Sequence, residues 1–122
     1  MTRLAEPAYV AAVLLLYADL PDTPLRSSPQ DQVLARRWYA QQIPLPLVES
    51  ALLLASLRRL VRSSDLPPLP AIRSLAYFRP VIAELQLQPL PDGYLDYLRL
   101  KLQRVGAHLP THVQKNPFSD DR

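Results

Sequence analysis

The chain has 122 residues and a mass of 13.8 kDa, which is the size of one domain with one modest core. Apolar residues make up 48% and charged residues 20% of the sequence, as in an ordinary globular protein, and the net charge is +3. The chain has no cysteine and only two glycines. This excludes disulfide scaffolds, thiolate metal sites and cysteine nucleophiles, and it argues against glycine-rich phosphate loops.

The apolar stretch near the start of the sequence predicts neither a membrane span nor a signal peptide. It covers residues 8–18 and contains two tyrosines, whereas a spanning helix needs about 20 apolar residues. Arg3 is followed by Glu6 and Pro7, and no small-residue cleavage pattern comes after the apolar stretch. We therefore expect a cytoplasmic protein that does not associate with membranes.

Residue usage favours helices. Leucine occurs 25 times and alanine 13 times, whereas valine, isoleucine and threonine together total 14. Fourteen prolines divide the chain, because proline breaks a helix interior but suits a first helical turn. The sequence predicts an all-α fold, a compact bundle of about five helices with proline-rich connectors. We expect a single domain over 1–107 and a polar, frayed tail over 108–122.

The first two helices are predicted at residues 7–18 and from the cap Ser28 to about Gln42. The first begins at Pro7, and the second has Pro29 and Asp31 in its first turn. Apolar residues of the first helix that are available to a core are Tyr9, Val10, Val13, Leu14, Leu16 and Tyr17. On the second helix we expect Val33, Leu34 and Trp38 to face inward and Gln32, Arg36 and Tyr39 to face outward.

The third helix is predicted over 46–63, with apolar residues around nearly its whole circumference, as expected of a central helix. A stiff connector over 64–71 contains three prolines. The fourth helix covers about 74–87, and Pro80 either kinks it or ends a tight first turn. The fifth is capped by Asp92, runs over about 93–105 and ends at Gly106, where a left-handed closing residue is expected.

Candidate catalytic groups are weak. His108 and His112 have helical i, i+4 spacing, but Pro110 between them argues against a helix and no carboxylate is close in sequence. Asp19 and Asp22 fit turn and cap chemistry better than paired catalytic carboxylates. The remaining candidates are isolated on helices or fit helix ends as caps: Glu49, Glu84, Ser27, Ser28, Ser63, Ser64 and Ser74. We expect no enzyme activity, no catalytic or metal site and no cofactor.

The basic residues are more informative. Twelve of the fourteen are arginine, which favours bidentate contacts to phosphate or carboxylate. Residues 36–104 hold ten basic and five acidic side chains, a net charge of +5, whereas residues 1–35 have a net charge of −2. The positive charge is therefore concentrated in the helical centre of the chain.

Two basic clusters are candidates for phosphate contact. Arg58, Arg59 and Arg62 close the third helix, where interaction with the negative end of the helix dipole is the alternative explanation. On the fifth helix, Tyr97, Lys101 and Arg104 share one face at i, i+4 and i+7. The separate core stripe of that helix is Leu95, Leu98, Leu102 and Val105. A cationic face with a tyrosine can follow a phosphate backbone and stack a base, or it can be a solvated surface.

Two motifs carry a family resemblance. The first is Pro-Leu-Val-Glu-Ser-Ala-Leu-Leu-Leu-Ala at residues 46–55, and the second is Tyr77-Phe78-x-x-Val81-Ile82-x-x-Leu85. Their order and spacing over residues 38–85 resemble the C-terminal helical domain of DnaD-like replication-initiation proteins. The sequence departs from the family pattern in three respects: Leu85 replaces a tryptophan, Pro80 lies within the second motif, and the connector is longer and proline-rich.

Members of that family bind DNA and assist helicase loading, so the resemblance implies a DNA-binding role. By position it implies a contact for Tyr77, and Arg73 and Arg79 are the neighbouring cations. Each apolar motif residue also fits a helix that packs one stripe on a neighbour. The sequence is compatible with both roles.

These observations favour a non-enzymatic nucleic-acid-binding accessory protein of replication or of a mobile element, with DNA expected ahead of RNA. The expected contact residues are Arg58, Arg59, Arg62, Arg73, Tyr77, Arg79, Tyr97, Lys101 and Arg104. The alternative is a helical protein-interaction module, a homo-oligomer or a small subunit of a larger assembly. In that case the arginines meet acidic residues of a protein partner and no nucleic acid is bound.

Overall fold

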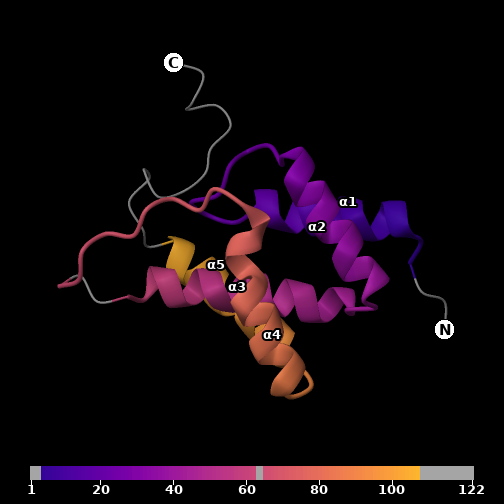
Figure 1. The fold of residues 1–122 in the computed structure, drawn as a ribbon. Helices are drawn as coiled ribbons and strands as arrows, with labels where there is room; N and C mark the ends of the chain where they lie inside the picture. Colours follow the sequence, from indigo (N-terminus) through magenta and orange to yellow (C-terminus); the bar gives the residue numbers. More distant parts are fainter. Residues whose placement is uncertain (1–3, 63–64, 108–122) are drawn as a thin grey trace.

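The computed structural model describes residues 4–62 and 65–107, and all regular structure within these ranges is helical. Figure 1 shows the arrangement of the helices. Their bounds are α1 Glu6–Ala18, α2 Pro29–Ala40, α3 Leu45–Leu60, the 3₁₀ helix η1 Leu75–Phe78, α4 Arg79–Leu87 and α5 Tyr94–Ala107. The all-α class is therefore confirmed. The predicted tail at 108–122, with His108 and His112, lies outside the described residues.

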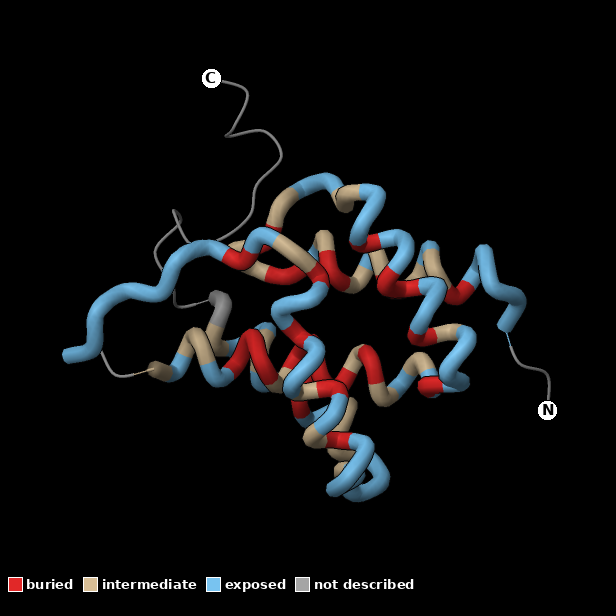
Figure 2. Tube along the Cα trace, viewed as in Figure 1, coloured by how far each residue is buried: buried red, intermediate tan, exposed pale blue. Residues whose placement is uncertain are grey.

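Helix α3 lies at the centre of the fold, as predicted. It packs against α1, η1, α4 and α5. Half of its residues are buried: Val48, Ser50, Ala51, Leu52, Leu53, Ala55, Ser56 and Leu57. Figure 2 shows buried positions along α3 and on the helices around it. Because the apolar residues surround α3 on most sides, several neighbours can bury surface against it at once.

Helices α1 and α2 pack against each other. Tyr9, Val13 and Tyr17 form the buried stripe of α1, at i, i+4 and i+8. Two predictions for α2 are wrong: Val33 is exposed, and Tyr39 packs on the core with its ring centroid 5.3 Å from that of Tyr9. The reason is that α1 packs on the face of α2 that carries Tyr39. Val33 lies on a different face of α2, which α1 does not cover.

The second motif contains a change of helix type. The tight first turn is the 3₁₀ helix η1, and α4 begins at Arg79 with Pro80 in its first turn. The missing N–H of Pro80 costs no helical hydrogen bond there, which is why the two helices meet at this point. Phe78, Ile82 and Leu85 are buried on one face, as the packing alternative for the motif expects.

The prediction that the fifth helix ends at Gly106, with a left-handed closing residue there, is wrong. Helix α5 continues through Gly106 to Ala107. The left-handed glycine is Gly93, with φ of +83°, immediately before α5 begins. The chain reverses direction between α4 and α5, and that reversal needs the positive φ. The predicted core stripe is confirmed: Leu98 is buried, and Leu95, Leu102 and Val105 pack partly buried against the core.

Asp31 links α2 to η1 through a buried carboxylate that is 2% exposed. Oδ2 accepts the backbone N–H of Ser28 at 2.9 Å, and the Ser28 hydroxyl accepts the N–H of Asp31 at 3.2 Å, so the two form a capping box. Oδ1 accepts the backbone N–H of Leu75 at 2.9 Å. One side chain therefore caps α2 and fixes the start of η1.

We expect Asp31→Ala to lower the free energy of unfolding by about 3 kcal/mol, because it leaves the buried N–H of Leu75 without an acceptor and removes a helix cap. Urea denaturation followed by circular dichroism measures the change. Asp96→Ala, at an exposed carboxylate, is the control and is expected to cost less than about 1 kcal/mol. Equal losses in the two variants would contradict the role of Asp31.

The buried hydroxyl of Tyr17 is expected to make the free energy of unfolding fall at high pH. Its side chain is fully buried, and its hydroxyl has no hydrogen-bond partner among the described residues. Burial, and then the charge of Asp31, raise the pKa of Tyr17 from 10.0 to about 12. Because the folded pKa is the higher one, the unfolded state loses this proton first as pH rises, so stability falls between about pH 10 and 12.

The expected loss through this range is about 3 kcal/mol, since one pKa unit corresponds to about 1.4 kcal/mol. Tyr17→Phe removes the titrating group, so its unfolding free energy should fall less over the same range. Urea denaturation of both proteins at pH 9, 10, 11 and 12 measures the difference. If the unfolding free energies of the two proteins fall in parallel with pH, the titration of Tyr17 does not cause the loss of stability.

Candidate functional site

The structure separates the predicted contact residues into three regions. The α3-end arginines are Arg58 and Arg59, in the last turn of α3, and Arg62, two residues after the helix ends. Tyr97, Lys101 and Arg104, the α5 face, lie on the exposed side of α5. Arg73, Tyr77 and Arg79 lie in or next to η1 and at the start of α4.

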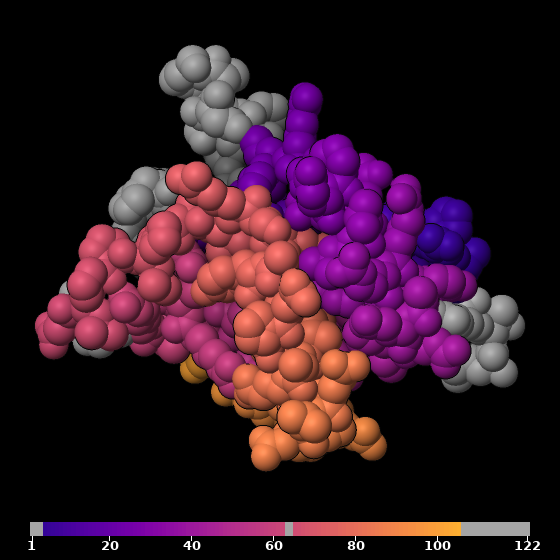
Figure 3. All heavy atoms as spheres, viewed as in Figure 1, coloured from indigo at the N-terminus to yellow at the C-terminus, as the bar shows by residue number. Residues whose placement is uncertain are grey.

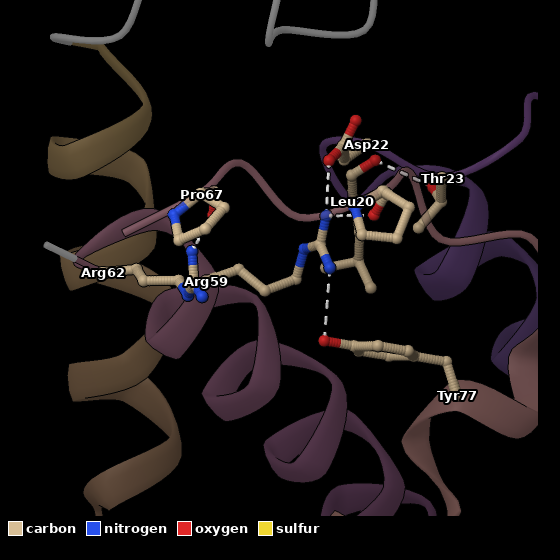
Figure 4. A network of polar contacts seen from close by, with 8 residues as sticks. Leu20, Asp22, Thr23, Arg59, Arg62, Pro67 and Tyr77 are labelled. Atoms are coloured by element: carbon tan, nitrogen blue, oxygen red, sulfur yellow. Dashed lines mark hydrogen bonds and ion pairs between the residues drawn. The ribbon is translucent and has the colours of Figure 1, made fainter. Parts of the chain in front are cut away.

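Arg59 binds three segments of its own chain, as Figure 4 shows. Its guanidinium donates hydrogen bonds to Asp22 Oδ2 at 2.6 Å, to the carbonyl of Pro70 at 2.9 Å and to the hydroxyl of Tyr77 at 3.2 Å. Its side chain is only 10% exposed. Arg59 therefore joins α3 to the α1–α2 loop, to the connector before η1 and to η1 itself.

The other α3-end arginines also bind the protein itself. Arg58 donates two hydrogen bonds to the carboxylate of Glu84, at 2.9 and 2.6 Å. These bonds hold the pKa of Glu84 below its ordinary value. Arg62 donates to the carbonyl of Pro67. A phosphate that approached these arginines would compete with hydrogen bonds that already exist.

Sequence reasoning missed these pairings because the partners are distant in the sequence. Asp22 and Glu84 lie 37 and 26 residues from their arginines. Arg99 is a further example, since it donates two hydrogen bonds to Glu49, at 2.8 and 2.9 Å, and one to Asp96 at 3.0 Å. Only the Arg99–Asp96 pair, at i, i+3, has a spacing that the sequence reveals.

The α5 face has the arrangement that the helical spacing predicts. Tyr97 is 50% exposed, and Lys101 and Arg104 are exposed on the same side of α5. Tyr97 also contacts Tyr94, with ring centroids 5.2 Å apart. Among the described residues, neither Lys101 nor Arg104 has a hydrogen bond or an ion pair. The α5 face therefore presents two cations and an aromatic ring to solvent.

A groove runs between α2 and η1–α4, and Arg37 and Arg79 line both of its adjoining cavities, of about 530 and 340 Å³. Arg37 was not among the predicted contact residues; its signal in the sequence was only its place in the basic centre of the chain. Tyr77 does not line this groove. Its hydroxyl accepts the Arg59 hydrogen bond and its ring packs edge-on against Phe78, at 5.2 Å between centroids. Arg73 is exposed just before η1.

Several carboxylates of the described residues are held by contacts within the protein. Over residues 4–62 and 65–107, no group of three or more histidine, aspartate or glutamate side chains could hold a metal ion. Asp22, Glu49 and Glu84 are engaged by arginines, and Asp31 is buried against backbone N–H groups. Within the same ranges, no helix is both long and apolar enough to cross a bilayer.

Arg59→Ala is expected to lower the free energy of unfolding by about 2 kcal/mol, because it removes three hydrogen bonds, one of them to a carboxylate, and the packing of a side chain that is only 10% exposed. Arg58→Ala removes an exposed ion pair and should cost about 0–1 kcal/mol. Urea denaturation of both variants measures the difference. The idea of a structural Arg59 fails if the two losses are equal.

None of the protein-family models, curated proteins or solved structures compared with the chain matches it. The resemblance to DnaD-like proteins therefore depends on the two motifs, at residues 46–55 and 77–85. The residues of those motifs lie in α3, η1 and α4, where their buried apolar members pack in the core. The α5 face lies outside both motifs.

Proposed function

We propose that the protein is a non-enzymatic nucleic-acid-binding accessory protein that uses the α5 face as its main contact surface. One observation carries the proposal: the α5 face combines two exposed cations without a carboxylate partner in the described chain with an exposed aromatic ring. The α3-end arginines, in contrast, are engaged by the protein itself.

The chemistry of the α5 face suits a polyanion with exposed bases. Lys101 and Arg104 can contact phosphates without first breaking an internal ion pair, and each contact releases condensed counterions. The Tyr97 ring lies one turn earlier, where an unstacked base can lie against it. Lys101 and Arg104 are one helical turn apart, with a rise of about 4.5 Å, so both can contact the same backbone segment.

The class of nucleic acid and the biological role come from the resemblance. It favours DNA over RNA and a role in replication or in a mobile element. Arg73 is a further exposed cation that can extend the contact, since it is not engaged by any described residue.

The proposal predicts that Lys101→Gln with Arg104→Gln weakens binding of a labelled DNA oligonucleotide about tenfold or more at low salt. It should also reduce the salt slope by about 2, because two phosphate contacts are lost. The matched control is Arg36→Gln with Arg58→Gln, which changes the net charge equally. Those two arginines already lie 4.0 and 2.6 Å from Glu6 and Glu84, so the control should bind within about threefold of wild type.

Fluorescence anisotropy with single-stranded DNA, double-stranded DNA and RNA at three salt concentrations measures these effects. The order of the three affinities identifies the preferred ligand class. Equal weakening in both double variants would show a net-charge effect and remove the α5 face from the proposal. Absence of binding to all three ligands at low salt would refute the nucleic-acid function itself.

A further inference from the structure

The groove between α2 and η1–α4 is a surface feature that the nucleic-acid proposal does not use. Figure 3 shows α2 and the η1–α4 segment side by side on one face of the molecule. The two adjoining cavities share Leu34, Arg37, Ala76 and Arg79. Together their linings extend along α2 from Pro29 to Trp38 and reach Gln41, the residue after the helix. A helix of 12 residues such as α2 is about 18 Å long.

The lining of the groove is partly apolar. Val33, which is 49% exposed, forms part of one wall. Leu34, Trp38 and Ile82 contribute deeper apolar surface. Covering this surface releases water from it, so a ligand with an apolar face gains free energy in the groove.

The charge of the groove comes from two arginines on opposite walls. Arg37 belongs to α2, and Arg79 begins α4. No aspartate or glutamate lines either cavity, and neither arginine has a hydrogen bond or an ion pair with a described residue. The polar remainder of the lining is mainly amide side chains: Gln30, Gln41 and Gln86. The groove is therefore apolar at its base and cationic at its walls.

We propose that this groove binds an acidic amphipathic segment of a partner protein. Its apolar side chains would cover Val33 and the surface beneath it, and its carboxylates would take bidentate hydrogen bonds from Arg37 and Arg79. A phosphate backbone matches the arginines but offers no apolar face to the base of the groove. The proposal goes beyond nucleic-acid binding, because it uses a different surface and a different class of partner.

A second copy of this chain fits the groove less well. Each described α-helix carries a single acidic residue: Glu6, Asp31, Glu49, Glu84 and Asp96. Asp31 is buried, and Glu49, Glu84 and Asp96 are bonded to arginines. No described helix therefore offers two free carboxylates to pair with Arg37 and Arg79, and the net charge of +3 opposes self-association.

The test uses a fluorescein-labelled amphipathic peptide of about 14 residues, with leucine along one face and glutamate beside it, added to the full-length protein. We expect saturable binding that weakens about tenfold or more when the peptide glutamates are replaced by glutamine. In the protein, Arg37→Gln with Arg79→Gln should weaken binding similarly. Lys101→Gln with Arg104→Gln, the matched control, should leave it within about twofold.

Val33→Asp tests the apolar part of the groove independently. Because Val33 is exposed, the variant should keep the wild-type urea midpoint and still weaken the peptide about fivefold or more. Equal losses in the groove variant and in the matched control would overturn the proposal, as would a failure of the acidic peptide to bind. Two other outcomes would also overturn it: loss of oligonucleotide affinity in the groove variant alone, or a concentration-dependent dimer that the same variant abolishes.

Discussion

The guanidinium of Arg59 joins three segments that the helices alone would leave loose. It bonds to Asp22, Pro70 and Tyr77, which lie in the α1–α2 loop, in the connector and in η1. The same loop holds the connector through a 2.9 Å hydrogen bond from the Ile72 N–H to the Asp22 carbonyl. Asp31 then fixes the start of η1. These bonds set where η1 and α4 lie beside α2, and hence they set the shape of the groove.

This network changes how the positive charge is interpreted. An excess of arginine suggests a polyanion partner. The α3-end arginines and Arg99, however, donate hydrogen bonds to carboxylates and carbonyls of the protein itself. Four of the cations that these bonds leave available lie on two other surfaces: Lys101 and Arg104 on the α5 face, and Arg37 and Arg79 on the walls of the groove between α2 and η1–α4. The two surfaces differ in chemistry: one is a helical face with an exposed tyrosine, and the other is a concave surface with an apolar base. This difference is why we assign them to different classes of ligand.

Much of the fold could be predicted, because prolines and caps act locally. Pro7, Ser28 and Pro46 lie within the first turn of helices or cap them, and the leucine pattern identified α3 as the central helix. The α5 face followed from helical periodicity alone. The pairings of Arg58 and Arg59 could not be predicted, because their partners come near only after the helices pack. The groove was missed for the same reason: its walls come from residues 37 and 79, which no local pattern connects.

We distinguish arginines that bond within the protein from cations on the α5 face that are free to contact DNA. NMR tests this distinction most directly, by following backbone amide and arginine side-chain signals while a short DNA oligonucleotide is added. We expect the largest shifts at Tyr97, Lys101 and Arg104. The signals of Asp22, Arg59 and Tyr77 should move little, because their contacts stay within the protein. The opposite pattern, with the largest shifts at Arg58, Arg59 and Arg62, would contradict the account, because it would mean that DNA replaces the internal partners of the α3-end arginines.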